Sequence, residues 1–136
     1  MPYRPIESTP LYRTCCNISN EIWFTVNKWS TFAKQSLGLQ LVKAADSVAA
    51  NLVEGDARHF YRDSIKFFDY AKSSAQEAGH WVRVATERGL IGEQMGVSWI
   101  KEFEEIGKMI NGLIGYRRRV MSDIVKEETA DYDADP

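Results

Sequence analysis

The four prolines of this chain stand at positions 2, 5, 10 and 136, so that residues 11–135 are free of proline. Proline removes a backbone N–H and breaks a helix interior at a cost of about 3 kcal/mol. Apolar residues recur at every third or fourth position through much of this proline-free stretch. The combination predicts long helices that pack side by side.

Four segments show the helical period, at about residues 10–29, 32–54, 61–88 and 93–121. Thr9 before Pro10 is typical of a helix start, and Ser30 and Thr31 can cap the second helix. Gly55 and Gly89 are expected to end the second and third helices, Gly55 by adopting a left-handed backbone.

Short connections between these segments predict an all-α fold, a single-domain antiparallel up-down-up-down four-helix bundle over residues 9–123. The length of 136 residues and the 44 % content of hydrophobic residues fit one soluble domain. No apolar run reaches the roughly 18 residues that a membrane span needs, and residues 1–8 lack the apolar stretch of a secretion signal. We therefore expect a cytoplasmic protein without a membrane partner.

Two segments lie outside the predicted bundle: an N-terminal extension, residues 1–8, and an acidic tail, residues 124–136, expected to be disordered. After Lys126 the tail holds five acids and no base, which leaves the rest of the chain mildly basic. These acids are Glu127, Glu128, Asp131, Asp133 and Asp135. A solvated terminus is the simpler interpretation; masking of a basic surface by mimicry of phosphates is the alternative.

Three glycines, Gly107, Gly112 and Gly115, stand inside the fourth predicted helix. Each costs about 1 kcal/mol relative to alanine in a helix interior, so a compensating contact is expected. Close helix crossing, within the bundle or between subunits, would supply it. The apolar face of this helix is also wider than a lone surface helix needs, which favours a homo-oligomer.

Residues for catalysis or metal binding are scarce. His59 and His80 fit no zinc spacing, and Glu77 with His80 forms only half of the paired Glu-x-x-His arrangement of di-iron bundles. The neighbouring Cys15 and Cys16 fit packing in a reducing compartment. No nucleophile elbow or phosphate-binding glycine loop is present. We therefore predict no catalytic residues, no metal and no cofactor.

Polar residues within the apolar second and fourth helices are predicted to have a structural role. Asn51 and Glu54 precede Gly55 near the end of the second helix, and Asn111 is central in the fourth. We expect Asn51 and Glu54 to be partly buried, with Asn111 as a hydrogen-bonding partner that fixes helix register. A ligand site is the alternative.

Basic residues are the remaining candidates for a functional surface. Arg58, Arg62 and Lys66 follow the second helix, and three consecutive arginines, at 117–119, end the fourth. We expect two patches at opposite ends of the bundle. For either patch alone, a solvated surface that complements the helix dipole is the simpler interpretation, and phosphate binding is the alternative. The tentative nucleic-acid-binding residues are Arg58, Arg62, Lys66, Arg117, Arg118 and Arg119.

Two sequence elements resemble a known family. The stretch SVAANLVEG at residues 47–55 is similar to the S-[IV]-P-x-N-[IL]-x-E-G element of the 23S rRNA intervening-sequence proteins, a bacterial four-helix-bundle family. EEIGKMINGLI at residues 104–114 resembles the closing element of this family. RGLI at residues 88–91 resembles its turn between the third and fourth helices. The resemblance covers residues 11–116. Ala49 replaces the usual proline, and Phe60 stands where a Ser or Thr cap is common.

This family includes the accessory variability proteins of diversity-generating retroelements, which form basic pentameric barrels. The resemblance therefore implies a homopentamer in which Asn51, Glu54, Gly55 and Asn111 are structural motif residues, and it permits an RNA or ribonucleoprotein partner. The leading hypothesis is a non-enzymatic oligomer that binds RNA through its basic residues. The alternative is a protein-binding scaffold without a nucleic-acid role.

Overall fold

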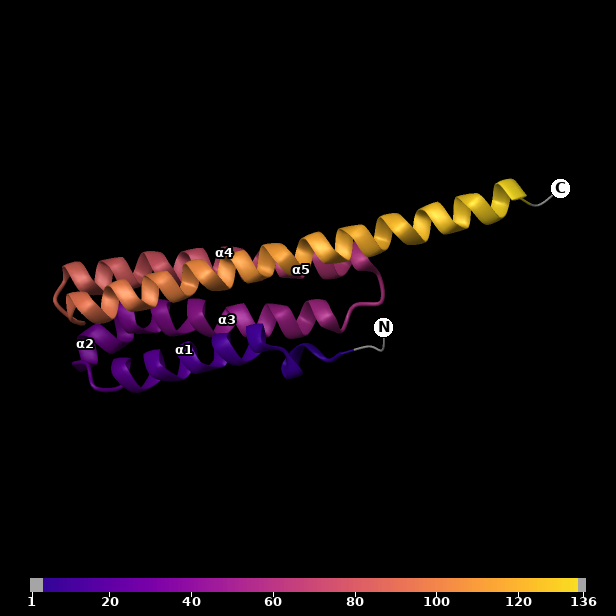
Figure 1. Cartoon of the computed structure of the whole chain (residues 1–136). Helices are drawn as coiled ribbons and strands as arrows, with labels where there is room; N and C mark the ends of the chain where they lie inside the picture. Colours follow the sequence, from indigo (N-terminus) through magenta and orange to yellow (C-terminus); the bar gives the residue numbers. More distant parts are fainter. Residues whose placement is uncertain (1–3, 135–136) are drawn as a thin grey trace.

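The computed structural model describes residues 4–134, with side chains as far as residue 130, and every regular element in that range is helical. The predicted all-α four-helix bundle is confirmed (Figure 1). In chain order the elements are η1 (Ile6–Ser8), α1 (Pro10–Val26), α2 (Thr31–Ala33), the π-helical η2 (Lys34–Gly38), α3 (Leu39–Asp56), α4 (Tyr61–Glu87) and α5 (Glu93–Ala134).

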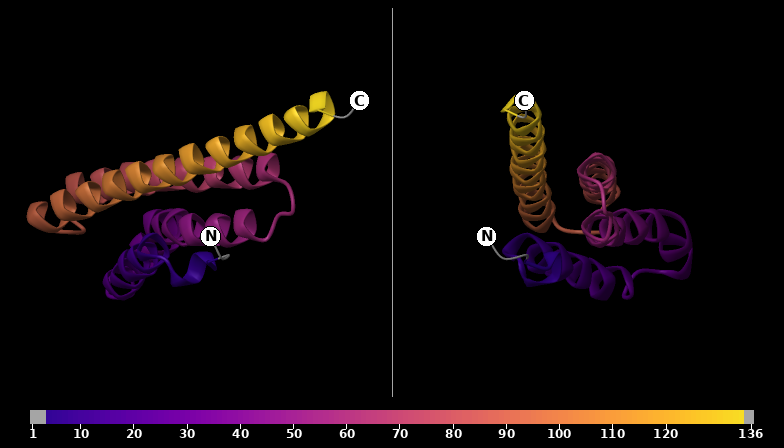
Figure 2. Two further views of the ribbon diagram at one scale, coloured as in Figure 1. Left: turned by 45° about the vertical axis from the view of Figure 1, so that its right-hand side comes forward. Right: turned by 90° about the vertical axis from the view of Figure 1, so that its right-hand side faces the viewer.

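The four long helices lie roughly parallel and occupy the corners of the bundle (Figure 2). α4 packs along both α3 and α5, and α1 packs against α3, whereas α1 and α5 touch at fewer places. The connections at residues 27–30, 57–60 and 88–92 are short, so successive helices run in opposite directions.

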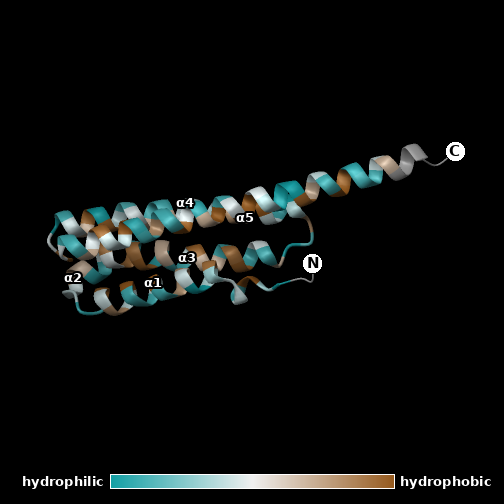
Figure 3. Cartoon of the chain, viewed as in Figure 1, coloured by the Kyte–Doolittle hydropathy of each residue, from teal (hydrophilic) through white to brown (hydrophobic). Residues whose placement is uncertain are grey.

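One continuous core runs through the bundle. Its largest fully buried side chains include Phe68 of α4, Leu41 and Leu52 of α3, and Ile106 and Ile110 of α5. These positions recur with the helical period, so each helix turns one apolar stripe inward. Figure 3 shows apolar residues concentrated along α3 and hydrophilic residues along the outer side of α4.

The helix starts follow the capping chemistry that the sequence predicts. Thr9 accepts a hydrogen bond from the Tyr12 amide at 3.2 Å, and Ser30 accepts one from the Ala33 amide at 3.3 Å. Phe60, by contrast, precedes α4 without a side-chain cap. Gly89 ends α4 with a φ of 74°, the left-handed conformation that favours glycine.

Gly55 does not end its helix, because α3 continues to Asp56 and only Gly89 among the described residues has a positive φ. The predicted left-handed role of Gly55 is therefore wrong. A Cβ atom at this position would lie 2.7 Å from Cε1 of Phe68. Gly55 thus lets α3 and α4 approach closely, which places the Phe68 ring in the core.

The second predicted helix contains a π-helical turn that the sequence pattern does not reveal. α2, η2 and α3 follow one another without a break, and η2 covers Lys34–Gly38. A Cβ at Gly38 would lie 2.7 Å from Cγ1 of Val26, so this turn packs tightly against the end of α1. Leu37 in this turn and Leu41 in α3 are four residues apart, and both are buried in the core.

α5 continues unbroken to Ala134, well past the predicted helix end near residue 121. Every residue from Ser122 to Ala130 is exposed, and Figure 1 shows this part projecting beyond the bundle. The predicted disordered tail is therefore wrong for residues 124–134, while residues 135 and 136 lie outside the described range. Glu127, Glu128 and Ala130 are good helix formers, and no glycine or proline interrupts them. Residues 122–134 are called the arm below.

The described part of the N-terminal extension packs onto the bundle. Ile6 is buried in the core cluster, and the η1 turn positions Thr9 to cap α1. Even the longest described helix, α5, lacks the apolar character that a bilayer crossing requires.

Candidate nucleic-acid interface

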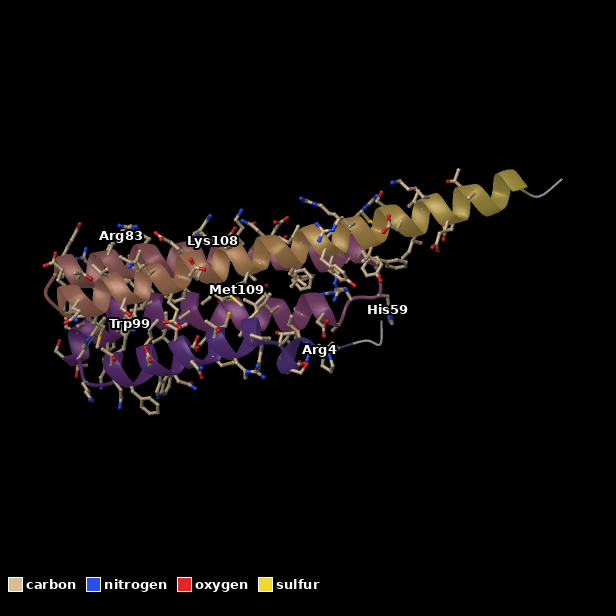
Figure 4. The ribbon with its side chains drawn as sticks, viewed as in Figure 1. Arg4, His59, Arg83, Trp99, Lys108 and Met109 are labelled. Atoms are coloured by element: carbon tan, nitrogen blue, oxygen red, sulfur yellow. The ribbon has the colours of Figure 1, made fainter. Side chains whose placement is uncertain are left out.

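The two predicted basic patches lie at the same end of the bundle, which corrects the prediction of opposite ends. In an up-down-up-down bundle the connection between the second and third long helices and the C-terminal end of the fourth share one end. Arg117 of α5 donates to Asp56 of α3 at 3.3 Å, which joins the two patches directly. Figure 4 shows His59 at the end from which α5 projects. This basic end comprises Arg58, His59, Arg62, Lys66, Arg117, Arg118 and Arg119.

Asp56 is the anchor of the basic end and was not foreseen from the sequence. Its side chain is only 7 % exposed, and its two carboxylate oxygens accept from Arg117 and from the Ile6 backbone N–H. One carboxylate therefore holds three segments together: the N-terminal extension, the end of α3, and α5. An acid between the motif glycine and a basic turn was the available sequence signal.

Arg117 has a structural role in this arrangement. Its guanidinium lies 5.5 Å from the centroid of the Tyr61 ring and 5.6 Å from that of Phe68, and its side chain is 18 % exposed. Because the Arg117 guanidinium pairs with Asp56 and lies near two aromatic rings, its interactions stabilise the fold. Of the predicted phosphate-binding residues it is the one least accessible to a ligand.

Arg58 and Lys66 make weaker local contacts. Arg58 pairs with Glu54 one turn earlier and lies 4.4 Å from the centroid of the Phe67 ring. Lys66 lies 5.9 Å from the Tyr70 ring. Both side chains remain exposed, so both cations can still face a ligand.

Arg62, Arg118 and Arg119 are the most available cations of the basic end. All three are exposed, and none forms an ion pair with the side chains that the structure describes. They come from two elements, since Arg62 is in the first turn of α4 and the other two are on α5. The sequence named these residues, and the fold brings the two elements that carry them to the same end of the bundle.

A hollow of about 480 Å³ separates the start of α4 from α5 at this end. We call it the notch. Its lining combines cationic, aromatic and apolar groups, and Phe60 is 72 % exposed. The lining residues are His59, Phe60, Tyr61, Arg62, Asp63 and Met121. The notch therefore offers an aromatic face beside positive charge, with Asp63 as the only acid in its lining.

The motif residues have local roles that differ in part from the prediction. Asn51 donates to the Ser47 carbonyl at 2.9 Å within its own helix, whereas Asn111 is exposed in the groove between α4 and α5. The predicted partnership of these two residues is therefore wrong. Glu54 is exposed and pairs with Arg58, although partial burial was predicted.

The Glu77 and His80 pair, half of a di-iron arrangement in the sequence, contacts Trp81. The indole N–H of Trp81 donates to Glu77 at 3.3 Å, and the His80 ring lies edge-on to Trp81.

Ionisable groups near the core show no catalytic arrangement within the described residues. Burial raises the pKa of the Cys15 thiol to about 12, which keeps it protonated and unreactive. Glu102 of α5 has its pKa raised by burial and then by the nearby charge of Glu21. Glu21 itself accepts a 3.1 Å hydrogen bond from the Trp99 indole, a polar link between α1 and α5. No group of metal-ligating side chains occurs in the described part of the chain.

The predicted close crossing at the α5 glycines is not made within the bundle. A Cβ added to Gly107 or Gly112 would meet no atom within 4 Å, and one at Gly115 would meet only the tip of Arg119. Gly107 and the equally open Gly79 of α4 line an exposed groove of about 490 Å³ between the two helices. Crossing between subunits stays a prediction.

The opposite end of the molecule is apolar at its surface. Phe32 is 84 % exposed, and Trp23 and Leu39 are about half exposed. A shallow groove of about 200 Å³ runs between the end of α1 and the π turn. Its lining is Trp23, Val26, Asn27, Lys34, Gly38, Leu39 and Val42.

Comparison with solved structures shows the same fold elsewhere. A crystal structure of a protein of unknown function from the S23 ribosomal protein family of Bacteroides thetaiotaomicron superposes with a TM-score of 0.68. The match covers 76 % of this chain and 97 % of that one at 17 % sequence identity. A comparison with curated proteins gives no match.

The family model described as 23S rRNA-intervening sequence protein matches residues 7–112. That range includes α1, α3 and α4, the first part of α5, the sequence element at residues 47–55 and all but the last two residues of the element at 104–114. It stops short of the three arginines at 117–119 and of the arm. The chain belongs to the 23S rRNA-intervening sequence protein family.

Proposed function

We propose that this protein is a non-enzymatic, homo-oligomeric cytoplasmic bundle that binds RNA or a ribonucleoprotein through its basic end. The observation that carries the proposal is that Arg62, Arg118 and Arg119 are exposed at one end of the bundle without an ion pair to any described side chain. Cations that are not neutralised by the protein can replace the counterions of a phosphate backbone.

Phe60 adds a contact that charge alone does not provide. An exposed aromatic ring beside cations can stack on an unpaired base, and such stacking contributes about 1–3 kcal/mol per base. The notch that Phe60 lines has a volume of about 480 Å³. The proposed ligand is therefore structured RNA with at least one unpaired nucleotide, bound mainly through its backbone.

The oligomeric part of the proposal is supported by the open glycines. Gly79 and Gly107 leave the groove between α4 and α5 free for the close approach of another helix. Membership in the family is consistent with the pentamer that the sequence resemblance implies. Light scattering on the full chain gives the particle mass, and leucine at both glycine positions should block the groove and lower that mass.

The RNA experiment is a titration of a structured RNA with the full chain at two salt concentrations. R62A/R118A/R119A should weaken binding and reduce the slope of log affinity against log salt by about 2–3, since each lost phosphate contact contributes roughly 0.7–0.9. K28A/K43A/K101A is the matched control, because it removes three exposed cations away from the basic end. Equal effects of the two triple variants, or binding that ignores salt, would contradict the proposal.

A protein-binding scaffold is the second candidate, and the exposed Trp23, Phe32 and Leu39 favour it. Exposed aromatic side chains around an apolar groove are common in protein interfaces. This function predicts a partner whose binding survives the arginine substitutions and is lost in W23A/L39D. A pull-down with both variants separates the two functions.

A further inference from the structure

The arm extends α5 beyond the bundle. It covers residues 122–134, about 20 Å of helix, and its described side chains, at residues 122–130, are all exposed. Isolated helices of this length are marginally stable in water, so a lone arm would gain stability from a second surface. Ile124 and Val125, at 39 % and 55 % exposure, give it an apolar strip to bury.

Charge is distributed unevenly along this part of α5. Arg118 and Arg119 stand just before the arm, whereas the arm itself holds five acids against the single base Lys126. Because the helix is unbroken, the arm points away from its own basic end and cannot fold back onto it (Figure 1). The arm of a second copy, approaching from the opposite direction, can reach that end.

We propose that the acidic arm of a second copy docks in the notch at the basic end, and that two copies exchange arms in this way. Glu127 and Glu128 of the incoming arm face Arg62 and His59, which line the notch, and the exposed Arg118, which precedes the lining residue Met121 by three positions on α5.

The apolar side chains of the incoming arm cover Phe60 and Met121, which line the notch. Asp63 is the one lining acid that opposes the contact. Two antiparallel arms make the interface isologous, so each copy gives one arm and receives one.

Regulation follows if the proposed RNA function holds. The docked carboxylates occupy the place that we assign to RNA phosphates, so RNA and a second copy compete for the basic end. The acidic arm of one chain then masks the basic end of another chain by mimicking RNA phosphates. The arm contact itself rests on the structure and charge pattern and stands apart from the RNA proposal.

A charge-swap experiment tests the contact, with sedimentation equilibrium of the full chain as the measurement. E127K/E128K and R62E/R118E should each weaken the arm contact at least tenfold. An equimolar mixture of the two variants should restore it, because each arm then meets a notch of opposite charge. The control is E87K/E93K, which makes the same charge change on exposed residues at the far end and should leave association unchanged.

If the bundles of several chains also associate through the α4–α5 groove, loss of the arm contact should halve the particle mass. This holds whatever number of chains the groove contact joins. A mixture that associates no better than its components, or E127K/E128K with the mass of the unmodified protein, would overturn the docking proposal. Restoration in the mixture supports it, provided that an equimolar mixture of E87K/E93K with R62E/R118E, which brings together the same opposite net charges, does not restore the contact.

RNA provides the second readout. Structured RNA should dissociate the arm contact, and E127K/E128K should bind RNA more tightly than E87K/E93K does. RNA that binds without changing the arm contact would overturn competition. If no RNA binds, the proposed function fails while the charge-swap result still decides the docking.

Discussion

The two parts of α5 share one helix but differ in what holds them. In the bundle, Trp99, Phe103, Ile106, Ile110 and Ile114 recur with the helical period and are all buried. In the arm, Ile124 and Val125 continue the apolar pattern and are exposed. Tertiary packing stabilises the first part, whereas the second relies on helix propensity until a partner covers it. A helical period alone therefore does not tell a core helix from an unpartnered one.

Truncating one isoleucine in each part should give the largest contrast. I110A removes a fully buried side chain and should destabilise the fold by about 3–4 kcal/mol, through lost burial and the cavity left behind. I124A in the arm should change stability by less than about 0.5 kcal/mol in dilute solution. Urea unfolding measures both. A similar cost at the two positions would show that the arm packs on its own bundle.

The Asp56 anchor lies where the bundle part ends, and its loss should have the next largest effect. D56N leaves the mostly buried Arg117 without its charge partner and should cost about 2–3 kcal/mol. E54Q breaks the exposed pair with Arg58 and should cost under about 0.5 kcal/mol. Thermal unfolding of both variants measures the difference. D56N as stable as E54Q would contradict the anchoring role.

Alanine substitutions at two glycines should distinguish a packed position inside the bundle from an open position on its surface. G55A should destabilise the fold by about 1–3 kcal/mol, because the added Cβ collides with Phe68. G107A meets open space in the groove and should stabilise an isolated chain by about 0.5–1 kcal/mol. Denaturation at low protein concentration tests the pair. A destabilising G107A under those conditions would mean that another part of the same chain fills the groove.

Glu102 should give the smallest effect, and one that depends on pH. Burial and the charge of Glu21 raise its pKa in the folded state, so the folded protein holds this proton more tightly than the unfolded chain. Its contribution to stability is present below the unfolded pKa and is lost as the pH rises through the folded value. E102Q should therefore stabilise the fold at pH 7 by about 0.5 kcal/mol and flatten this decline. A steeper decline in E102Q would contradict the assignment.

Much of the bundle could be predicted from local sequence. Thr9, Ser30 and Gly89 act through their nearest neighbours along the chain, so their roles follow from short-range chemistry. Gly55 was misread, because a glycine near a helix end is usually a cap, and only the position of Phe68 across the interface reveals its packing role. The arm was misread because acidic composition suggested disorder, although its residues are good helix formers.

The candidate site was only half predictable. The sequence supplied Arg58, Arg62, Lys66 and the three arginines at 117–119 but assigned them to opposite ends. Whether two segments meet depends on the topology of the whole bundle, which no local pattern states. Asp56 escaped notice for the same reason, since its partners lie 50 and 61 residues away along the chain.

Proline placement, helical period and capping residues were enough to determine an all-α bundle, because each acts within a few residues through backbone hydrogen bonding and side-chain direction. The tertiary structure decided which residues meet: that Arg117 is held by Asp56, that three other arginines face solvent at the same end of the bundle, and that the side chains of residues 122–130 are left exposed. Those outcomes depend on how whole helices are placed in space, and long-range geometry is not written in any one stretch of the chain.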